Sequence, residues 1–321
     1  MRFLVTGGAG YVGSVVTELL LERGHEVVVL DDLSTGHRAA VAPGARFVHG
    51  DLRQPESLAG ALGGGIEAVL HFAARSLVGE SRRDPIGYYA DNLGGATALL
   101  RGMLAAGVRR MVFSSSAAVY GEPEAQPIPE TATPRPIHAY GGSKRAIEML
   151  LEDAARAFDL RAASLRYFNA AGATPRCGED HRPETHLIPA ILHRVGVRRA
   201  VTVHGGDYPT PDGTCIRDYV HVRDLAEAHV LALESDFHGA LNLGSGRGHS
   251  VLEVVSAVRR VTGEEVPVTV GPRRPGDPPR LVADVARAES ELGWRARTDL
   301  DAIVRSAAEW HRLHPHGYKT E

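Results

Sequence analysis

The sequence predicts an α/β protein with a doubly wound parallel sheet and a smaller C-terminal lobe. In the first half of the chain, short apolar runs rich in β-branched residues alternate with helix-length segments. These runs are apolar on both faces, as expected for parallel strands that helices cover on both sides. After residue 170 the chain contains long segments rich in proline and glycine, which are typical of functional loops.

The apolar runs predict strands at residues 2–7, 25–32, 46–52, 68–74, 109–116 and 162–169. Helices are expected between them near residues 11–23, 56–62, 88–106 and 141–157. In the second half, helices are expected near residues 187–198, 222–234, 249–262 and 299–313. We therefore assign residues 1–170 to the sheet domain and residues 171–321 mainly to the second lobe, with segments near 215–245 returning to the sheet domain.

Composition excludes several classes of protein. No apolar run approaches the roughly 20 residues of a membrane helix. A net charge of -3 gives no general attraction to nucleic acid. Two cysteines in 321 residues make no disulfide framework, and the first strand begins directly after Met1, without a signal peptide. We expect a cytoplasmic protein with no nucleic-acid or membrane partner.

The stretch "TGGAGYVG" follows the first expected strand and opens the first expected helix. Its glycines, Gly7, Gly10 and Gly13, permit a tight turn and let the backbone and the helix N-terminus approach a pyrophosphate. Tyr11 and Val12 open the helix within this turn and are expected to contact the cofactor as well. The context of strand, turn and helix predicts a Rossmann-type dinucleotide site.

Two acidic pairs follow the next two strands. Asp31 and Asp32 end the second strand, near the expected offset of about 20 residues for an acid that hydrogen-bonds the adenosine ribose. A carboxylate there repels a 2'-phosphate, so NAD is favoured over NADP. Asp51 and Leu52 follow the third strand and would border the adenine, although a surface turn explains them equally well.

Tyr140 and Lys144 stand one helical turn apart in "AYGGSK". The chain has 36 basic side chains, yet Lys144 and Lys319 are its only lysines. If the helix starts near Gly141, Lys144 lies in the first turn, where a cation opposes the helix dipole. We interpret Lys144 as a compact cation that lowers the pKa of the Tyr140 phenol and hydrogen-bonds a ribose, with Tyr140 as a general base.

Three serines, Ser114, Ser115 and Ser116, end the fifth expected strand. Ligands bind at the carboxyl ends of the strands in such sheets. We therefore expect Ser116 to orient the substrate oxygen beside Tyr140.

Several motifs occur together in collinear order: T-G-G-x-G-Y-x-G-S, S-S-S-x-x-V-Y-G, Y-x-x-x-K, "RYFN", "GEDHRPETHLIP", "DGTCIRDYVHVRDLA" and "NLGSG". Together they resemble the extended short-chain dehydrogenase/reductases, and most closely the UDP-glucose 4-epimerase (UDP-galactose 4-epimerase) group. The resemblance implies an isomerase that uses NAD to oxidise C4 of a UDP-sugar transiently and to reduce it again on the other face. It also implies Tyr140 as the base, Lys144 as its tuner and ribose contact, and Ser116 as the hydroxyl partner.

The resemblance also implies ligand contacts for residues elsewhere in the chain. Further cofactor contacts would come from Phe72, Ala73, Ala74, Asn92, Ser114 and Tyr167. Substrate contacts would come from Asn169, His186, Leu187, His204, Arg217, Arg274, Asp277 and Leu281. A simple salt bridge of Arg217 with Asp218 or Asp224 is the alternative for that arginine.

The sequence departs from the usual pattern of the group at a few positions. Asp91 stands where asparagine is common, Ser76 lies close to a common lysine position, and His204 replaces a common phenylalanine that would face the uracil. Leu281, of intermediate size, lies where the group varies beside the C2 substituent of the sugar. Plain UDP-hexoses are therefore favoured, and UDP-N-acetylhexosamines and UDP-pentoses stay open.

Two other functions are less favoured by the residues. A nucleotide-sugar 4,6-dehydratase needs an acid–base pair where this chain has Ala117 and Ala118, which cannot move protons. A non-catalytic NAD-sensing regulator would not need Tyr140 and Lys144. By resemblance, and because the expected helices near 88–106 and 141–157 have wide apolar faces, we expect a homodimer.

The segment "CGEDHRPETH" offers Cys177, His181 and His186 as metal ligands. Zinc sites prefer tighter pairs such as C-x-x-C, and the interleaved carboxylates suit a polar loop equally well. The sequence alone therefore leads us to expect no metal.

Overall fold

The computed structural model describes residues 1–197, 199–274 and 276–319, and its centre is a seven-stranded sheet. All six pairings of neighbouring strands in this sheet are parallel. The strand order is β10-β6-β5-β4-β1-β2-β3, which confirms the predicted fold class. The strands are β1 (Arg2–Thr6), β2 (Glu26–Asp31), β3 (Arg46–His49), β4 (Ala68–His71), β5 (Arg110–Ser116), β6 (Arg161–Tyr167) and β10 (Gly239–Leu243).

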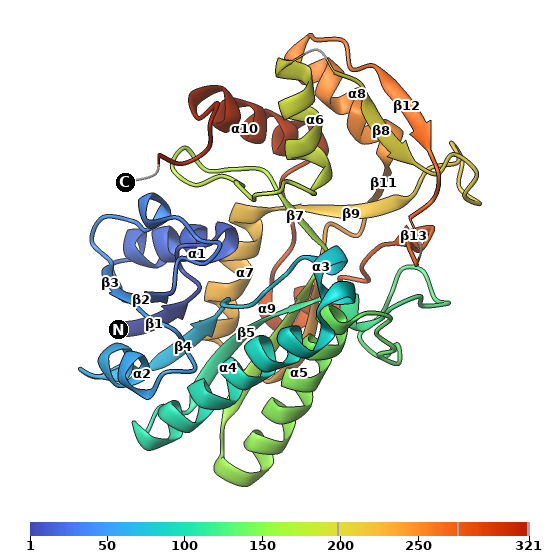
Figure 1. Ribbon diagram of the computed structural model, residues 1–321. Coiled ribbons are helices and arrows are strands. Elements are labelled where there is room, and N and C mark those ends of the chain that lie inside the picture. Colours follow the sequence, from blue (N-terminus) through green and yellow to red (C-terminus); the bar gives the residue numbers. More distant parts are fainter. Residues whose placement is uncertain (198, 275, 320–321) are drawn as a thin grey trace.

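Helices cover both faces of this sheet (Figure 1) because its strands are apolar on both sides. In β1, Phe3 and Val5 pack into the core under α1 (Tyr11–Glu22) and α7 (Val222–Glu234). Leu4 points to the opposite core, which is built from α2 (Pro55–Leu62), α4 (Pro85–Ala105) and α5 (Ala139–Phe158).

The second lobe has its own core and two small sheets. Its helices are α6 (Leu187–Gly196), α8 (Val251–Thr262) and α10 (Leu300–Leu313). One sheet pairs β8 (Val201–His204) with β12 (Val268–Gly271). The other joins β7 (Asn169–Ala171), β9 (Ile216–His221), β11 (Gly248–Ser250) and β13 (Arg280–Leu281).

The structure contains elements that the sequence analysis did not predict. Helices α3 (Val78–Arg83) and α9 (Ala286–Leu292) are too short to show clear helical periodicity, and two 3₁₀ turns span Arg38–Ala40 and Ala117–Val119. Strand β10 extends the main sheet beside β6, whereas β9 belongs to the second lobe.

The expected helices mostly differ from the observed ones by a residue or two at their ends. Helix α8 begins at Val251 rather than 249, because Ser250 and Glu253 form a reciprocal capping box. The last residue expected in α6, 198, lies outside the described residues. No helix within the described ranges is long and apolar enough to cross a membrane.

His229 on α7 gives the fold a dependence on pH. Its ring is fully buried beside Phe72, and burial lowers the pKa of His229 to about 4. As the pH falls below about 6.5, the unfolded chain binds a proton here and the folded chain does not, so stability is lost on acidification. We expect this histidine to account for about 2 kcal/mol of the stability lost between pH 7.5 and 5.

Urea unfolding of the wild type and of His229→Leu at pH 7.5 and pH 5 measures this contribution. The stability difference between the two pH values should be smaller by that amount in the variant. The exposed His238, replaced by glutamine, is the matched control because its ring is hydrated in both states. An equal pH dependence in His229→Leu and wild type would show that His229 is not the titrating group.

Candidate active site

The candidate active site lies at the carboxyl end of the main sheet, where β1, β4 and β5 end beside the N-terminus of α1. Helix α1 begins at Tyr11 after the N-cap residue Gly10, and no described side chain caps it. No acidic residue stands in its first turn either. The free amides of this turn therefore form an anion site suited to a pyrophosphate.

The glycines of the turn are required by close backbone packing. Gly7 has a φ of +73°, and a Cβ there would lie 2.5 Å from the Ala73 nitrogen at the end of β4. A Cβ on Gly13 would lie 2.3 Å from the carbonyl oxygen of Gly7. The Tyr11 phenol donates a 2.6 Å hydrogen bond to the Gly172 carbonyl, so only its backbone is available to the turn.

Asp31 ties the end of β2 to the glycine turn. Its Oδ2 accepts a 2.9 Å hydrogen bond from the Ala9 amide, and its Oδ1 accepts one of 2.9 Å from the Leu33 amide. Burial raises the pKa of Asp31, and these two hydrogen bonds oppose the shift. Each oxygen keeps acceptor capacity, as ribose recognition requires. Asp32 instead accepts hydrogen bonds from the amide and hydroxyl of Ser34 in a local turn.

The Asp51 carboxylate forms a salt bridge with Arg53. Arg53 binds it through Nη2 at 2.6 Å and also pairs with Asp91, and the hydrogen bonds from Arg53 lower the pKa of Asp51. Leu52 packs against the core near Gly95. Asp51 and Leu52 thus lie between β3 and α4, and their contact with adenine stays a prediction.

Asn92 joins the end of β4 to α5. Its Oδ1 accepts a 2.8 Å hydrogen bond from the Arg75 amide, and its Nδ2 donates to the Arg75 carbonyl at 3.1 Å and to Ser143 Oγ at 3.0 Å. The neighbouring Asp91 points to Arg53 and Arg75 instead. Arg75, which precedes Ser76, is held by Asp84 and Asp91.

Helix α5 begins earlier than expected. His138 is its N-cap and accepts a hydrogen bond from the Gly141 amide at 3.2 Å, so the helix starts at Ala139. Lys144 therefore lies in the second turn, and the expectation that it lies in the first turn is wrong. The helix dipole falls off within the first turn, so burial dominates the energetics of this lysine.

Tyr140, Ser116 and Lys144 come together in the structure. The Tyr140 phenol and the Ser116 side chain share a hydrogen bond. The Lys144 side chain is buried, its Nζ donates to the Ser114 carbonyl at 2.7 Å, and it lies 5.9 Å from the centre of the Tyr140 ring. The Ser114 hydroxyl is hydrogen-bonded to the Tyr167 phenol at 2.7 Å, which places two more predicted cofactor contacts in this cluster.

Burial opposes the expected effect of Lys144 on the pKa of Tyr140. Burial raises the pKa of Tyr140, and the hydrogen bond with Ser116 is what lowers it. Burial also lowers the pKa of Lys144 to about 7, against the opposing charge of Glu148. Burial costs both charged forms free energy, so the lowering of the phenol's pKa by Lys144 stays a prediction.

Sequence analysis missed a buried ion pair beneath these residues. Glu148 accepts hydrogen bonds from Arg166 Nε at 2.8 Å, from Arg166 Nη2 at 2.7 Å and from Ser115 Oγ at 2.6 Å. Arg166 Nη1 also donates to the Tyr120 hydroxyl at 2.9 Å. Two signals were available: Glu148 follows Lys144 by one helical turn, and Arg166 interrupts an apolar strand.

Several predicted substrate contacts meet where β7, β9 and β13 run side by side. Arg217 on β9 stands opposite Leu281 on β13, and its guanidinium pairs with Asp277. Asn169 on β7 donates to the Asp218 carbonyl at 2.9 Å. Arg217, Asp277, Leu281 and Asn169 thus lie close to one another.

The alternative ion pairs considered for Arg217 are wrong. The Asp218 carboxylate is buried and accepts hydrogen bonds from the backbone amides of Ser245, Gly246 and Ala283, while Asp224 accepts from those of Arg297 and Thr298. Both carboxylates therefore bind backbone amides of loops and do not pair with Arg217.

The remaining predicted substrate residues lie on the second lobe. His186 is the N-cap of α6, directly before Leu187, and the neighbouring Glu179 raises its pKa well above the usual value. His204 ends β8 opposite Gly271 on β12, and Arg274 is exposed in the loop that follows. Their contact with a nucleotide stays a prediction.

Comparison with known proteins gives matches over nearly the whole chain. Residues 3–244 match the model of the NAD dependent epimerase/dehydratase family. A UDP-glucose 4-epimerase of Streptomyces lividans is 53% identical, and the alignment covers 99% of this chain and 98% of that protein. The crystal structure of UDP-glucose 4-epimerase from Brucella ovis in complex with NAD has a TM-score of 0.92 at 47% identity, covering 96% of this chain and 97% of the other. That of UDP-glucose 4-epimerase from Bifidobacterium longum in complex with NAD+ and UDP has a TM-score of 0.94 at 36% identity, covering 99% and 100%.

Proposed function

The chain belongs to the NAD dependent epimerase/dehydratase family, and on that premise we propose that it interconverts UDP-glucose and UDP-galactose with NAD as cofactor. It is an isomerase. The observation that carries this proposal is the cluster of Tyr140, Ser116 and Lys144 at the same edge of the sheet as the N-terminus of α1, which no described side chain caps. The similarity to UDP-glucose 4-epimerases along the full chain supports this reaction.

The residues present fit NAD. The glycine turn leaves free amides for the pyrophosphate, and Asp31 keeps acceptor capacity for a ribose hydroxyl while disfavouring a 2'-phosphate. Phe72, Ala73 and Ala74 follow β4 next to this turn and would line the cofactor. When bound, NAD supplies a reversible hydride acceptor at C4 of the sugar.

Proton transfer is assigned to Tyr140. As the phenolate, Tyr140 would take the proton of the 4-hydroxyl group, and as the resulting phenol it would return that proton, acting as general base and then as general acid. Ser116 hydrogen-bonds the same phenol and orients the sugar oxygen. Lys144, with its Nζ fixed on the Ser114 carbonyl, places a cation beside the phenol when protonated and hydrogen-bonds the nicotinamide ribose.

The nucleotide must be held while the sugar turns over. Arg217 would release Asp277 and bind the diphosphate, with Arg274 as a second cation, because a guanidinium binds phosphate oxygens with two hydrogen bonds. Asp277 would then accept from the uridine ribose. His186, Leu187, Asn169 and His204 would line the uracil and phosphate side of the cleft.

The choice of sugar is tested by comparing two substrates. Leu281 is half-buried against the cluster around Phe168, and we expect it to leave little room for an N-acetyl group. The purified protein should convert UDP-galactose to UDP-glucose with a larger kcat/KM than it shows for UDP-N-acetylgalactosamine. A larger value for the acetylated sugar would move the assignment to UDP-N-acetylhexosamines, and retention of NAD without turnover of any UDP-sugar would favour an NAD sensor.

The homodimer is part of the proposal. Ile86 and Tyr89 on α4 and Met149 on α5 are exposed apolar side chains on helices that pack against each other, and a second copy would cover them. Sedimentation should give twice the chain mass of 34.3 kDa for the wild type and one chain mass for Ile86→Asp combined with Met149→Asp.

Val270, exposed on β12 of the second lobe, is the matched control for this surface. Val270→Asp should stay dimeric, and a wild-type protein of one chain mass would contradict the dimer.

Cys177 and Cys215 are both free and buried, which fits the proposed location in a reducing cytoplasm.

A further inference from the structure

Four side chains of the loop before α6 converge on one point. Glu179, His181, Glu184 and His186 each offer one donor atom, and these atoms all lie within 4.8 Å of one another. Their spacing in the sequence does not form the tight pairs of familiar zinc motifs. The loop brings them together all the same, while Cys177 turns away, its Sγ facing the Ala40 carbonyl at 3.8 Å.

The distances between the donor atoms suit one small cation. His186 Nδ1 lies 2.8 Å from Glu179 Oε1 and 3.0 Å from Glu184 Oε1, and His181 Nδ1 lies 3.4 Å from Glu179 Oε1. Ligands held about 2.0–2.2 Å from a divalent transition metal are separated from one another by similar distances. Small side-chain adjustments would therefore place all four donors around one ion.

Two donor atoms of this cluster lack hydrogen-bond partners among the described residues. They are His181 Nδ1 and Glu184 Oε2. The Glu184 side chain is only 8% exposed, and the two atoms face each other across 4.0 Å. Unpaired buried polar atoms are costly and rare in folded proteins. A tetrahedral ion with bonds of about 2.1 Å separates its ligands by about 3.4 Å, so a small closure of this gap would let one ion contact both atoms.

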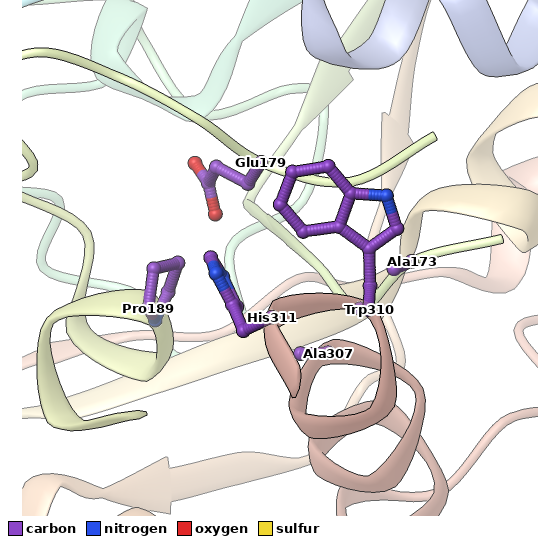
Figure 2. A pocket seen from close by; sticks show the side chains of 7 residues that line it. Ala173, Glu179, Pro189, Ala307, Trp310 and His311 are labelled. Atoms are coloured by element: carbon purple, nitrogen blue, oxygen red, sulfur yellow. The ribbon is translucent and has the colours of Figure 1, made fainter. Parts of the chain in front are cut away.

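The surroundings of Glu179 also favour a cation. Its side chain is 5% exposed and borders a pocket too narrow for a water-sized sphere, lined also by Pro189, Trp310 and His311. Figure 2 shows the imidazole of His311 pointing toward the Glu179 carboxylate. His311 Nδ1 has no partner among the described residues, so this ring is available as an outer hydrogen-bond partner of the ligand carboxylate.

The set of donors selects the class of metal. Two imidazole nitrogens and two carboxylate oxygens suit zinc or another first-row transition metal better than Mg²⁺ or Ca²⁺, which prefer oxygen ligands. Metal binding displaces the protons from the ligating nitrogens of the two imidazoles, and one divalent ion then cancels the charge of the two buried carboxylates. The His186 side chain is 43% exposed, which leaves a route for the ion to enter.

We propose that Glu179, His181, Glu184 and His186 bind one divalent transition metal ion, with Zn²⁺ as the best-fitting ion, which pins this loop to the start of α6. The sequence led us to expect no metal, because the donors are not closely spaced along the chain. The proposal differs because the fold brings these donors together. The site is distinct from the cluster of Tyr140, Ser116 and Lys144. It does not depend on the proposed function, because metal binding is measured without substrate.

The test uses the full-length protein stripped of metal with EDTA. Calorimetric titration with Zn²⁺, together with metal analysis by mass spectrometry, should give one ion per chain, and excess Mg²⁺ should not compete. Glu184→Gln and His181→Gln should each weaken Zn²⁺ binding at least about tenfold. His249→Gln is the matched control, because His249 lines a groove with Asp212, Glu253 and Asp301 and should bind no ion there.

A second measurement uses only the wild-type protein, so its result does not depend on whether a variant folds. Co²⁺ added to the stripped wild type should produce visible d–d absorption that saturates at one ion per chain and is displaced by Zn²⁺. Absence of that absorption, or equal Zn²⁺ affinity in the wild type and both cluster variants, would overturn the site. The four side chains would then form only a hydrogen-bonded histidine–carboxylate cluster.

Discussion

Replacing Tyr140 with phenylalanine is expected to lower kcat for the conversion of UDP-galactose to UDP-glucose by about 10²–10⁴-fold. The change removes only the phenol oxygen, which hydrogen-bonds Ser116 and is the group assigned to carry the proton of the 4-hydroxyl. The ring that packs near Lys144 stays in place. A coupled assay that detects UDP-glucose measures the loss, and absorbance of the purified variant checks that NAD is still bound.

Tyr208→Phe is the matched control for this prediction. The Tyr208 hydroxyl is buried without a hydrogen-bond partner among the described residues, so its removal should leave kcat nearly unchanged. If Tyr140→Phe kept more than about a tenth of the wild-type kcat, the base would have to be another group. If the variant lost NAD as well, the phenol would be needed for the cofactor site rather than for proton transfer alone.

Arg166→Leu is expected to lower the free energy of unfolding by about 3–5 kcal/mol. Arg166 and Glu148 are nearly fully buried, with 5% and 2% of their side chains exposed, and Arg166 binds this carboxylate through two nitrogens. The partly exposed Arg145 makes only a single contact with it, at 3.2 Å. Removing Arg166 leaves a buried negative charge beneath Ser115 and close to Lys144. Chemical denaturation followed by circular dichroism measures the change.

An exposed ion pair provides the control. Arg156 and Asp153 are 70% and 71% exposed, so Arg156→Leu should cost about 1 kcal/mol or less. Combining Arg166→Leu with Glu148→Leu should recover part of the lost stability, because the unpaired charge is then gone. A double variant no more stable than Arg166→Leu would mean that packing or the hydrogen bond to Tyr120, and not charge compensation, is what Arg166 contributes.

The position of Lys144 could be predicted from local sequence patterns, but the pKa values around it could not. Its spacing from Tyr140 and its rarity in an arginine-rich chain pointed to a special role, and the structure buries it beside that phenol. The pattern did not reveal, however, that burial raises the pKa of the phenol. Sequence spacing does not report how much solvent each group loses, and burial dominates the pKa values of both side chains.

The sequence by itself determined the parallel sheet, most helix positions and the glycine turn, because apolar periodicity and glycine spacing are local properties that act on the backbone directly. It also placed Tyr140 and Ser116 at ends of elements that a parallel sheet must bring to one edge. Only the tertiary structure decided which distant charges meet. Arg166 with Glu148, Arg217 with Asp277, and the convergence around Glu179 depend on strand order and loop path. A charged side chain takes whichever partner the packed fold brings within reach, and no local period encodes that choice.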